Sequence, residues 1–314
     1  MTTGQRIAVG LLAIATACAG RAAAENASGQ ALIGSLEFSS DTDGFDAWRA
    51  RAGGLLSYAN PWSYAGVAAQ STHYAQQDFR KEAHGILGLY RNQNRDTLAG
   101  FDAEAGVARV SGHLRPIGEA TWRLIPTSTS AVALTASADL VETPIALNRG
   151  IGYTLVSASA EQQFGARFTA TALAGWQAFT DGNSRAHLRA SLIWLAVPEA
   201  GMTLQFRYRQ YATSDADVGG AYFNPDRYRQ WLGVAAIRKR HAGWIFSGAL
   251  GAGEERLRGI DSHSSYLGEL RVDGPVARDG RLALHAGYYR SAGFIDSTDY
   301  AYRLVGATLI WPLR

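Results

Sequence analysis

The sequence is poor in cysteine, methionine, proline and charge. Its 314 residues include one Cys, two Met and eight Pro, and only 18% are charged, which is low for a soluble domain. Cys18 lies in the N-terminal apolar stretch, so the rest of the chain has no thiol for a disulfide, a zinc cluster or a nucleophile. No later apolar run is long enough for a transmembrane helix. The net charge of +3, without a block of like charge, gives no indication of nucleic-acid binding.

The N-terminus has the three parts of a secretory signal peptide. Arg6 precedes an apolar run over 7–20, and Arg21-Ala-Ala-Ala follows it, which reads as a charged start, a short apolar core and an Ala-x-Ala cleavage site. We predict a signal peptide over 1–24 and one domain over 25–314. Removing Arg6 and Arg21 leaves a net charge of +1. A lipoprotein acylated at Cys18 is the alternative, although Ala15-Thr16-Ala17 matches such a site poorly.

The remaining chain is rich in glycine and aromatics and alternates with period two. In 202–211 one face carries Met202, Leu204, Phe206 and Tyr208, and the other carries Thr203, Gln205, Arg207 and Arg209. This period is typical of a strand between two different solvents. In an outer-membrane barrel these are lipid outside and a wet lumen inside. With 35 Gly, 14 Tyr and 8 Trp, the pattern predicts an all-β, closed antiparallel transmembrane β-barrel rather than a soluble exported β-sandwich.

Counting such segments gives about sixteen strands, each near the length that a tilted strand needs to cross a bilayer. Fourteen are possible because 63–74 and 83–92 alternate poorly. The strands are predicted at 31–40, 47–58, 63–74, 83–92, 98–110, 118–125, 130–140, 152–162, 166–178, 184–196, 202–212, 228–239, 244–253, 264–272, 280–290 and 300–313. Long links at 75–82, 141–151, 213–227, 254–263 and 291–299 alternate with tight turns. We therefore expect both termini in the periplasm of a Gram-negative bacterium and 213–227 outside.

Signatures of enzymes, metals and cofactors are absent from the sequence. It contains no P-loop, no Gly-x-Ser-x-Gly and no His-Glu-x-x-His, and its seven histidines show no metal spacing. Asp261-Ser-His-Ser-Ser265 could suggest a rim hydrolase, but adjacent residues in a loop seldom meet as nucleophile and base. We expect no enzyme activity, no cofactor and no metal.

The lumen face of the predicted barrel is charged. Nine inward arginines stand against six inward carboxylates, namely Glu37, Asp102, Glu104, Glu119, Asp139 and Glu269. Cross-strand pairing would hold the wall rigid, whereas a surplus of guanidinium groups would favour anionic solutes; the first reading accounts for most of the charges. The predicted channel-lining residues are Arg49, Arg51, Arg123, Arg167, Arg189, Arg207, Arg209, Arg271, Arg281 and Tyr289.

One stretch carries a family resemblance. "GGAYFNPDRYRQWLGVAAIRKRHAGWIFSGALGAGEE" at 219–255 resembles the C-terminal barrel of the cellulose synthase operon protein C family, to which the poly-N-acetylglucosamine export porin is related. The match covers roughly residues 200–255. Glycine freedom and the Asn-Pro step explain most of the motif as a strand start. The residues predicted at the extracellular mouth are Gly219, Gly220, Tyr222, Phe223, Asn224, Pro225 and Tyr228.

The resemblance implies a channel that exports a linear exopolysaccharide across the outer membrane, with aromatic and arginine side chains touching the polymer. The sequence departs from those exporters because it shows no tetratricopeptide repeats, and its final "LIWPLR" lacks the usual terminal aromatic. A separate periplasmic tetratricopeptide-type or lipoprotein partner and an inner-membrane synthase are therefore expected. The alternatives are a general or anion-preferring diffusion porin and a docking barrel in a synthesis complex.

Overall fold

The computed structural model describes residues 29–215, 217–259, 261–276, 280–291 and 300–313. The predicted signal peptide at 1–24 lies outside these residues. Sixteen strands form one sheet that closes on itself, each strand antiparallel to the next. No helix in the described part of the chain could cross a membrane by its length and apolarity.

The described elements follow each other in a simple up-and-down order. Six-residue α2 (Pro144–Arg149) and the short 3-10 turn η1 (Pro198–Ala200) interrupt it. The strands are β1 (Gln30–Asp41), β2 (Asp46–Asn60), β3 (Ser63–Gln76), β4 (Phe79–Gln93), β5 (Gly100–Val110), β6 (His113–Thr127), β7 (Ser130–Leu140), β8 (Gly152–Phe164), β9 (Phe168–Phe179), β10 (Ser184–Val197), β11 (Met202–Thr213), β12 (Arg227–His241), β13 (Trp244–Leu257), β14 (His263–Val276), β15 (Gly280–Ser291) and β16 (Tyr300–Leu313).

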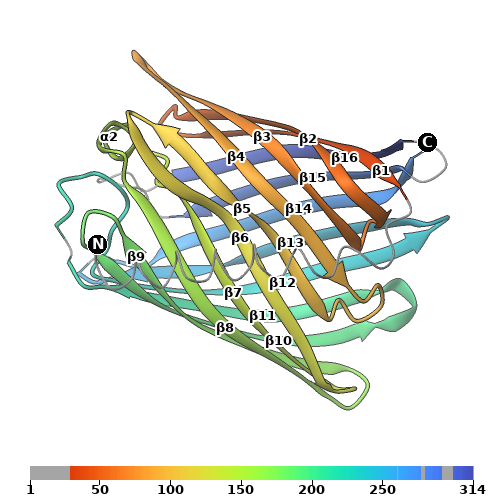
Figure 1. The fold of residues 1–314 in the computed structure, drawn as a ribbon. Coiled ribbons are helices and arrows are strands. Elements are labelled where there is room, and N and C mark those ends of the chain that lie inside the picture. The colour runs from red at the N-terminus through yellow and green to blue at the C-terminus, as the bar shows by residue number, and fades with distance from the viewer. Residues whose placement is uncertain (1–28, 216, 260, 277–279, 292–299, 314) are drawn as a thin grey trace.

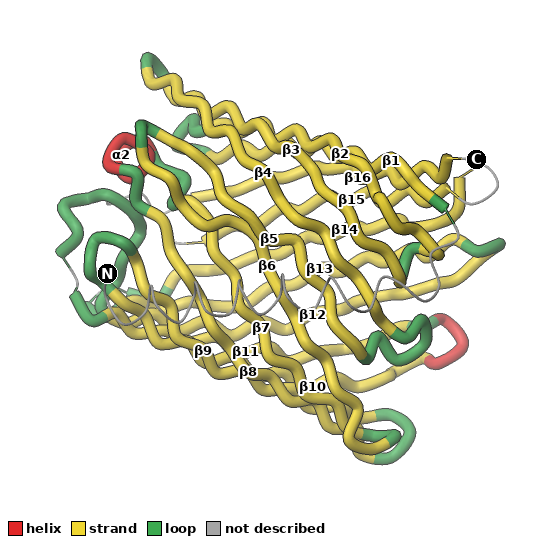
Figure 2. Tube along the Cα trace, in the orientation of Figure 1, coloured by secondary structure: helices red, strands yellow, loops and turns green. Residues whose placement is uncertain are grey.

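Pairing of the first strand with the last closes the barrel. Gln30 of β1 faces Leu313 of β16, and the ladder continues to Asp41 opposite Tyr302. The start of β1 and the end of β16 therefore lie at one end, the terminal end. The opposite end, the loop end, carries α2 and the connection 214–226 (Figures 1 and 2).

The sixteen predicted strands are confirmed, but two links are shorter than expected. β3 runs to Gln76 and β4 begins at Phe79, so 75–82 is mostly strand. The turn between them uses Gln77 with a positive φ of 47°. Likewise β13 extends to Leu257 and β14 begins at His263. Ladder hydrogen bonds extend these polar strand ends beyond the segments in which hydrophobic alternation is visible.

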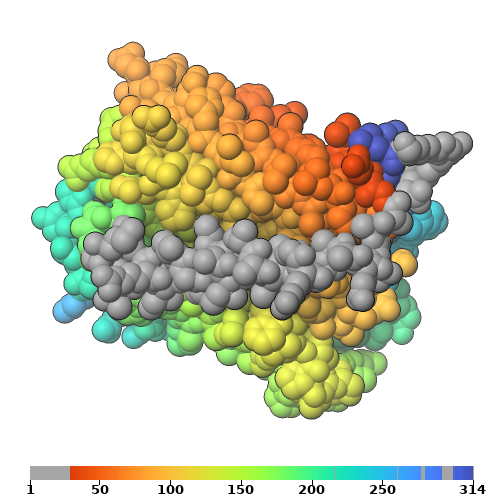
Figure 3. All heavy atoms as spheres, in the orientation of Figure 1, coloured from red at the N-terminus to blue at the C-terminus, as the bar shows by residue number. Residues whose placement is uncertain are grey.

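Outward side chains form an exposed apolar surface. Leu36, Leu250 and Leu270 are 66%, 74% and 65% exposed. Water-soluble monomers seldom expose many large apolar side chains next to one another. The N-terminal strands, red to yellow in the space-filling view, lie side by side over much of one face of the barrel (Figure 3). Such a surface suits hydrocarbon.

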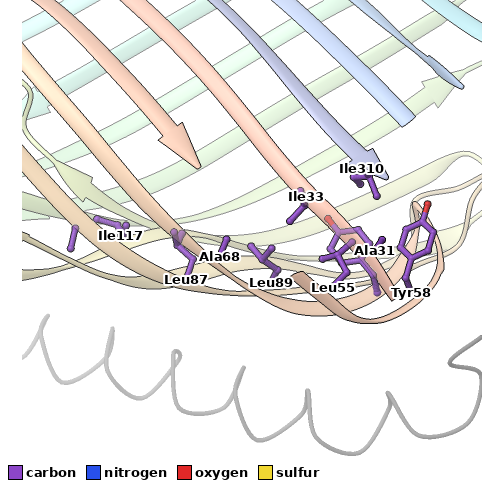
Figure 4. Packing of buried hydrophobic residues seen from close by; sticks show 11 residues of the cluster. Ala31, Ile33, Leu55, Tyr58, Ala68, Leu87, Leu89, Ile117 and Ile310 are labelled. Atoms are coloured by element: carbon purple, nitrogen blue, oxygen red, sulfur yellow. The ribbon is translucent and has the colours of Figure 1, made fainter. Parts of the chain in front are cut away.

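Inward side chains near the terminal end pack on one another. Ala31, Leu55, Leu87 and Leu89 from β1, β2 and β4 are each at most 3% exposed and belong to the cluster in Figure 4. A Cβ at Gly66 would lie 2.3 Å from the carbonyl oxygen of Gly54, so only glycine permits the approach of β3 to β2 there. This packing stiffens the wall that carries the charged residues further along.

An arginine introduced on the outer face of the barrel should lower its stability more than one introduced on the inner face. Leu134 of β7 points outward and is 56% exposed, whereas its neighbour Ala133 faces Arg123 and Ser159 inside. Leu134→Arg should destabilise the barrel by about 2–4 kcal/mol, the cost of an arginine near the bilayer midplane. The control Ala133→Arg lies at the same depth in the wet lumen and should cost less than Leu134→Arg, even though it stands opposite Arg123. Denaturant titration in lipid vesicles measures both, and equal losses would contradict the assignment of the faces.

Candidate channel lining and constriction

The connection between β7 and β8 folds into a short helix with clear end signals. Thr143 is extended and its hydroxyl accepts a hydrogen bond from Ala146 N at 3.3 Å, the standard N-cap arrangement. Pro144 occupies the first turn, where its missing N–H costs nothing. Gly150 ends the helix with φ 61°, a conformation that favours glycine. These signals were present in the sequence, but the helix was not predicted.

This connection packs against the inner side of neighbouring strands. Ser111 Oγ donates to Leu147 O at 2.7 Å, and Arg115 Nε donates to Gly150 O at 2.6 Å. A Cβ on Gly150 would meet the His113 ring at 2.4 Å. The Leu147 side chain is fully buried in a cluster that includes Tyr74. The connection 141–151 therefore narrows the loop end of the barrel.

An ion pair fixes 141–151 to a distant strand. Glu142 Oε1 lies 2.6 Å from Arg49 NH2 of β2 and accepts a hydrogen bond from the Tyr74 hydroxyl at 3.2 Å. Arg49 also pairs with Glu37 at 3.3 Å and lies 3.7 Å from Asp139. We call Arg49, Tyr74 and Glu142 the latch, because they join the connection to strands far from it in the sheet.

The connection 214–226 packs on the first one. The Thr143 hydroxyl donates to Ala221 O, and the Tyr222 ring stacks on Phe179 with centroids 4.7 Å apart. The Tyr222 hydroxyl donates to Asp181 at 3.0 Å and accepts from Asn183 at 3.1 Å. Burial raises the pKa of Tyr222, so the hydroxyl stays protonated and able to donate.

The glycines of the predicted mouth motif have the backbone angles expected of them. Gly219 and Gly220 have φ of 60° and 65°, a region in which glycine is at no disadvantage. Pro225 precedes β12, and its carbonyl accepts from the Thr213 hydroxyl at 3.1 Å. This part of the motif shapes the turn into the strand.

Phe223, Asn224 and Tyr228 of the motif form hydrogen bonds with two arginines of the lumen wall. Arg185 NH2 donates to Phe223 O at 2.9 Å and contacts Asn224 Oδ1 at 3.3 Å. The Tyr228 hydroxyl accepts from Arg209 NH2 at 2.8 Å and donates to Glu255 at 2.7 Å.

Stacking leaves little aromatic surface for a sugar at this point. The Tyr228 ring lies 4.7 Å from Tyr211 at an angle of 10° and is 1% exposed. Tyr222 is also buried, at 5% exposure. The expectation that these two rings touch a passing polymer is therefore wrong. Only Phe223 of the three motif aromatics is partly exposed.

Most of the predicted channel-lining arginines are paired with carboxylates. Arg51 pairs with Glu104, Arg123 lies 3.5 Å from Glu161, and Arg281 pairs with Asp273. A further ion pair, between Arg91 and Asp102 at 2.8 Å, was not predicted from the sequence. Tyr289 donates to Glu269 at 2.8 Å. This part of the lumen wall follows the pairing interpretation.

One predicted channel-lining residue lies outside the strands. Arg167 falls in the turn between β8 and β9, where it is exposed and its carbonyl accepts from Leu195 N. The prediction placed the strand start two residues too early, which made Arg167 a wall residue. Arg271 lies on the inner face of β14, opposite His285 in the ladder, and its side chain is 68% exposed and lies 3.8 Å from Asp273.

The wall formed by β9 to β12 contains no Asp or Glu. Arg189 of β10 is directly opposite Arg209 of β11 in the ladder. Arg185 lies four residues before Arg189, on the same face of β10. Arg207 contacts Gln205 at 2.9 Å and lies 4.0 Å from Glu269. Arg185 and His187 were not among the predicted channel-lining residues, although the alternation of 184–196 could have indicated them.

These side chains line a cavity at the loop end. Its volume is about 400 Å³, within the range of small-ligand sites. The lining residues include Arg185, His187, Arg189, Arg209, Tyr211, Phe223, Tyr228, Tyr153 of β8 and Tyr300 of β16.

The residues considered for hydrolase chemistry have other contacts. Ser265 is 1% exposed; its hydroxyl donates to Arg290 O at 3.0 Å and accepts from Gln230 at 2.7 Å. Within the described ranges, no group of three or more His, Cys, Asp or Glu side chains could hold a metal ion.

Comparisons with known proteins place the fold among outer-membrane barrels. No protein-family model matches the chain, and no curated protein matches it. A solved "bacterial polysaccharide outer membrane secretin" is similar with a TM-score of 0.65 at 10% identity, over 90% of this chain and 98% of that one. OccAB1 of Acinetobacter baumannii has a TM-score of 0.47 at 9% identity, over 91% of this chain and 97% of that one. The likeness to the polysaccharide secretin concerns the barrel fold alone, and the resemblance of this chain to the cellulose synthase operon protein C family stays a prediction.

Proposed function

We propose that this barrel is inserted in the bacterial outer membrane and conducts a linear exopolysaccharide out of the periplasm. The observation that carries the proposal is the constriction: a charged lumen, narrowed at one end by two interlocked connections around a cavity of about 400 Å³. Conduction of a polymer needs many weak contacts rather than one tight site. The similar barrel described as a polysaccharide secretin supports the proposal.

In this proposal the terminal end faces the periplasm and the loop end faces the outside, as in other barrels with long external connections. A periplasmic tetratricopeptide-type or lipoprotein partner would deliver the polymer from an inner-membrane synthase. The barrel itself would catalyse no reaction and need no cofactor. The second candidate is an anion-preferring diffusion porin, which the carboxylate-free wall of β9 to β12 favours.

The latch should keep the constriction closed. Glu142→Gln keeps the size of the side chain but removes the charge paired with Arg49. Both side chains are about a quarter exposed. The closed constriction should therefore lose about 1–2 kcal/mol of stability relative to the open one, less than the loss of a fully buried pair would cost. That corresponds to about a tenfold rise in the open fraction seen by single-channel recording.

Glu161→Gln is the matched control for the latch variant. It removes a carboxylate that pairs with Arg123 between two wall strands at 3.5 Å and leaves the connection 141–151 untouched. Its conductance should equal that of the wild type. Arg49→Gln should raise the open fraction at least as much as Glu142→Gln, because it also leaves Glu37 and Asp139 without this partner, and the double variant should resemble Arg49→Gln. Unchanged gating in both latch variants would show that 141–151 is not the gate.

Transport of a glycan can be tested in planar bilayers and in the bacterium. We expect a low, gated conductance that oligosaccharides block from the terminal end, and less surface polysaccharide when the gene is deleted. A steady, large conductance that oligosaccharides do not block would indicate a diffusion porin instead. A barrel without any conductance would contradict both transport functions and favour the docking role.

A further inference from the structure

The constriction contains positive charges that the wall does not neutralise. The arginine cluster, defined as Arg185, Arg189 and Arg209, lies on two adjacent strands, with Arg189 directly opposite Arg209. Like charges in directly opposed positions destabilise a sheet. No Asp or Glu occurs on β9 to β12, where a partner would be within reach. Rigidity of the wall therefore does not explain this cluster, in contrast to the paired arginines elsewhere.

The carboxylates near the cluster in the described ranges are engaged with other groups. Asp181 accepts the Tyr222 hydroxyl at 3.0 Å, and Asp226 pairs with Arg258. Glu255 lies behind Tyr228, whose hydroxyl donates to it at 2.7 Å, and it also accepts from Ser291 at 2.7 Å. The cluster thus faces the cavity without a carboxylate of its own wall between the guanidinium groups and the lumen.

Several donors of the cluster are left over after the protein's own contacts. Arg189 is exposed to the cavity and makes no hydrogen bond or ion pair within the described residues. The Nε atoms of Arg185 and Arg209 are buried and have no hydrogen-bond partner in the described part of the chain. His187 donates from Nε2 to the Gln177 amide oxygen at 2.8 Å, which leaves Nδ1 as an acceptor without a partner there. The donors of Arg189 are exposed to the cavity, so this arrangement suits an acceptor that enters the cavity.

The surrounding residues hold the guanidinium groups in place. Arg185 lies 4.5 Å from the Tyr211 ring centroid, and Arg209 lies 5.0 Å from that of Tyr228. Phe223 O and Tyr228 hydroxyl fix one nitrogen of each. Pre-ordered guanidinium groups lose little entropy when they bind a carboxylate, and they match its two oxygens.

We propose that the arginine cluster is an anion subsite of the constriction and binds the carboxylate of a uronic-acid residue in the passing glycan. This inference rests on the proposed export function and specifies it: the exported polymer is acidic. Arg189, which has no partner among the described residues, takes the carboxylate first, and Arg185 and Arg209 support it from either side.

The experiment compares block of the single-channel current by oligogalacturonate and by a neutral cello-oligosaccharide of equal length. We expect the acidic oligomer to block the wild-type channel about tenfold more tightly, as one charge-assisted contact would give. Arg189→Gln should remove this difference and leave the neutral block unchanged. Arg189→Lys should keep part of it, because the charge remains but the two-pronged geometry is lost.

Arg123→Gln is the matched control because it removes one inward positive charge that is paired with Glu161 at 3.5 Å. The preference for the acidic oligomer should persist in this variant. Arg189→Gln also relieves the repulsion with Arg209, so the variant should resist denaturant as well as or better than the wild type. Correct folding can thus be checked independently of block.

Two outcomes would overturn the subsite. One is equal block by both oligomers in the wild type, which leaves glycan export intact. The other is an equal loss of preference in Arg123→Gln, which would assign the effect to net charge. If neither oligomer blocks but galacturonate monomer competes with chloride in an Arg189-dependent way, the subsite holds and the export function fails. Failure of the two proposals is therefore distinguishable.

Discussion

The closed hydrogen-bond ladder is the constraint on which every other feature depends. A strand in hydrocarbon has no water for its N–H and C=O groups, so the sheet must close without a free edge. Pairing of Gln30–Asp41 with Tyr300–Leu313 achieves this. Closure also fixes the register, and register fixes which side chains enter the lumen, because one residue of slippage would exchange the two faces. The meeting of Arg51 with Glu104, and of Arg91 with Asp102, is a consequence of that register.

Within the fixed wall, the charged residues serve two different purposes. On β1 to β8 four inward arginines have carboxylate partners, namely Arg49, Arg51, Arg91 and Arg123, so this wall holds its own side chains in place. On β9 to β12 the arginines face one another without carboxylates on those strands. This segregation sets up a field across the lumen that acts on charged solutes. The connection 141–151 brings Glu142 to Arg49, so the paired side of the lumen also anchors the constriction.

The sequence allowed prediction of the strands because alternation is local. Strand number, topology and the inward position of Arg49, Arg189 or Arg209 follow from period two and an even count. The latch could not be predicted, since Glu142 and Arg49 are 93 residues apart and no local pattern reports which connection bends inward. The helix at Pro144–Arg149 is an intermediate case: Thr143, Pro144 and Gly150 are readable signals, but six residues give no helical period to detect. Arg167 was misplaced because strand boundaries are less well determined than strand existence.

The stretch Tyr222 to Tyr228 shows why residue type alone is a weak guide to contact with a ligand. Three aromatics beside an external connection suggest a surface for stacking sugars, yet Tyr222 and Tyr228 are buried and stacked on Phe179 and Tyr211. Their hydroxyls and the neighbouring Phe223 carbonyl are committed to Asp181, Arg209 and Arg185. The motif therefore acts on the lumen indirectly, by fixing the direction of two guanidinium groups. A charged side chain that is held in advance binds its partner at a lower entropic cost than a free one, so this stretch shapes the constriction mainly through the arginines that it holds, with Phe223 as its one partly exposed aromatic.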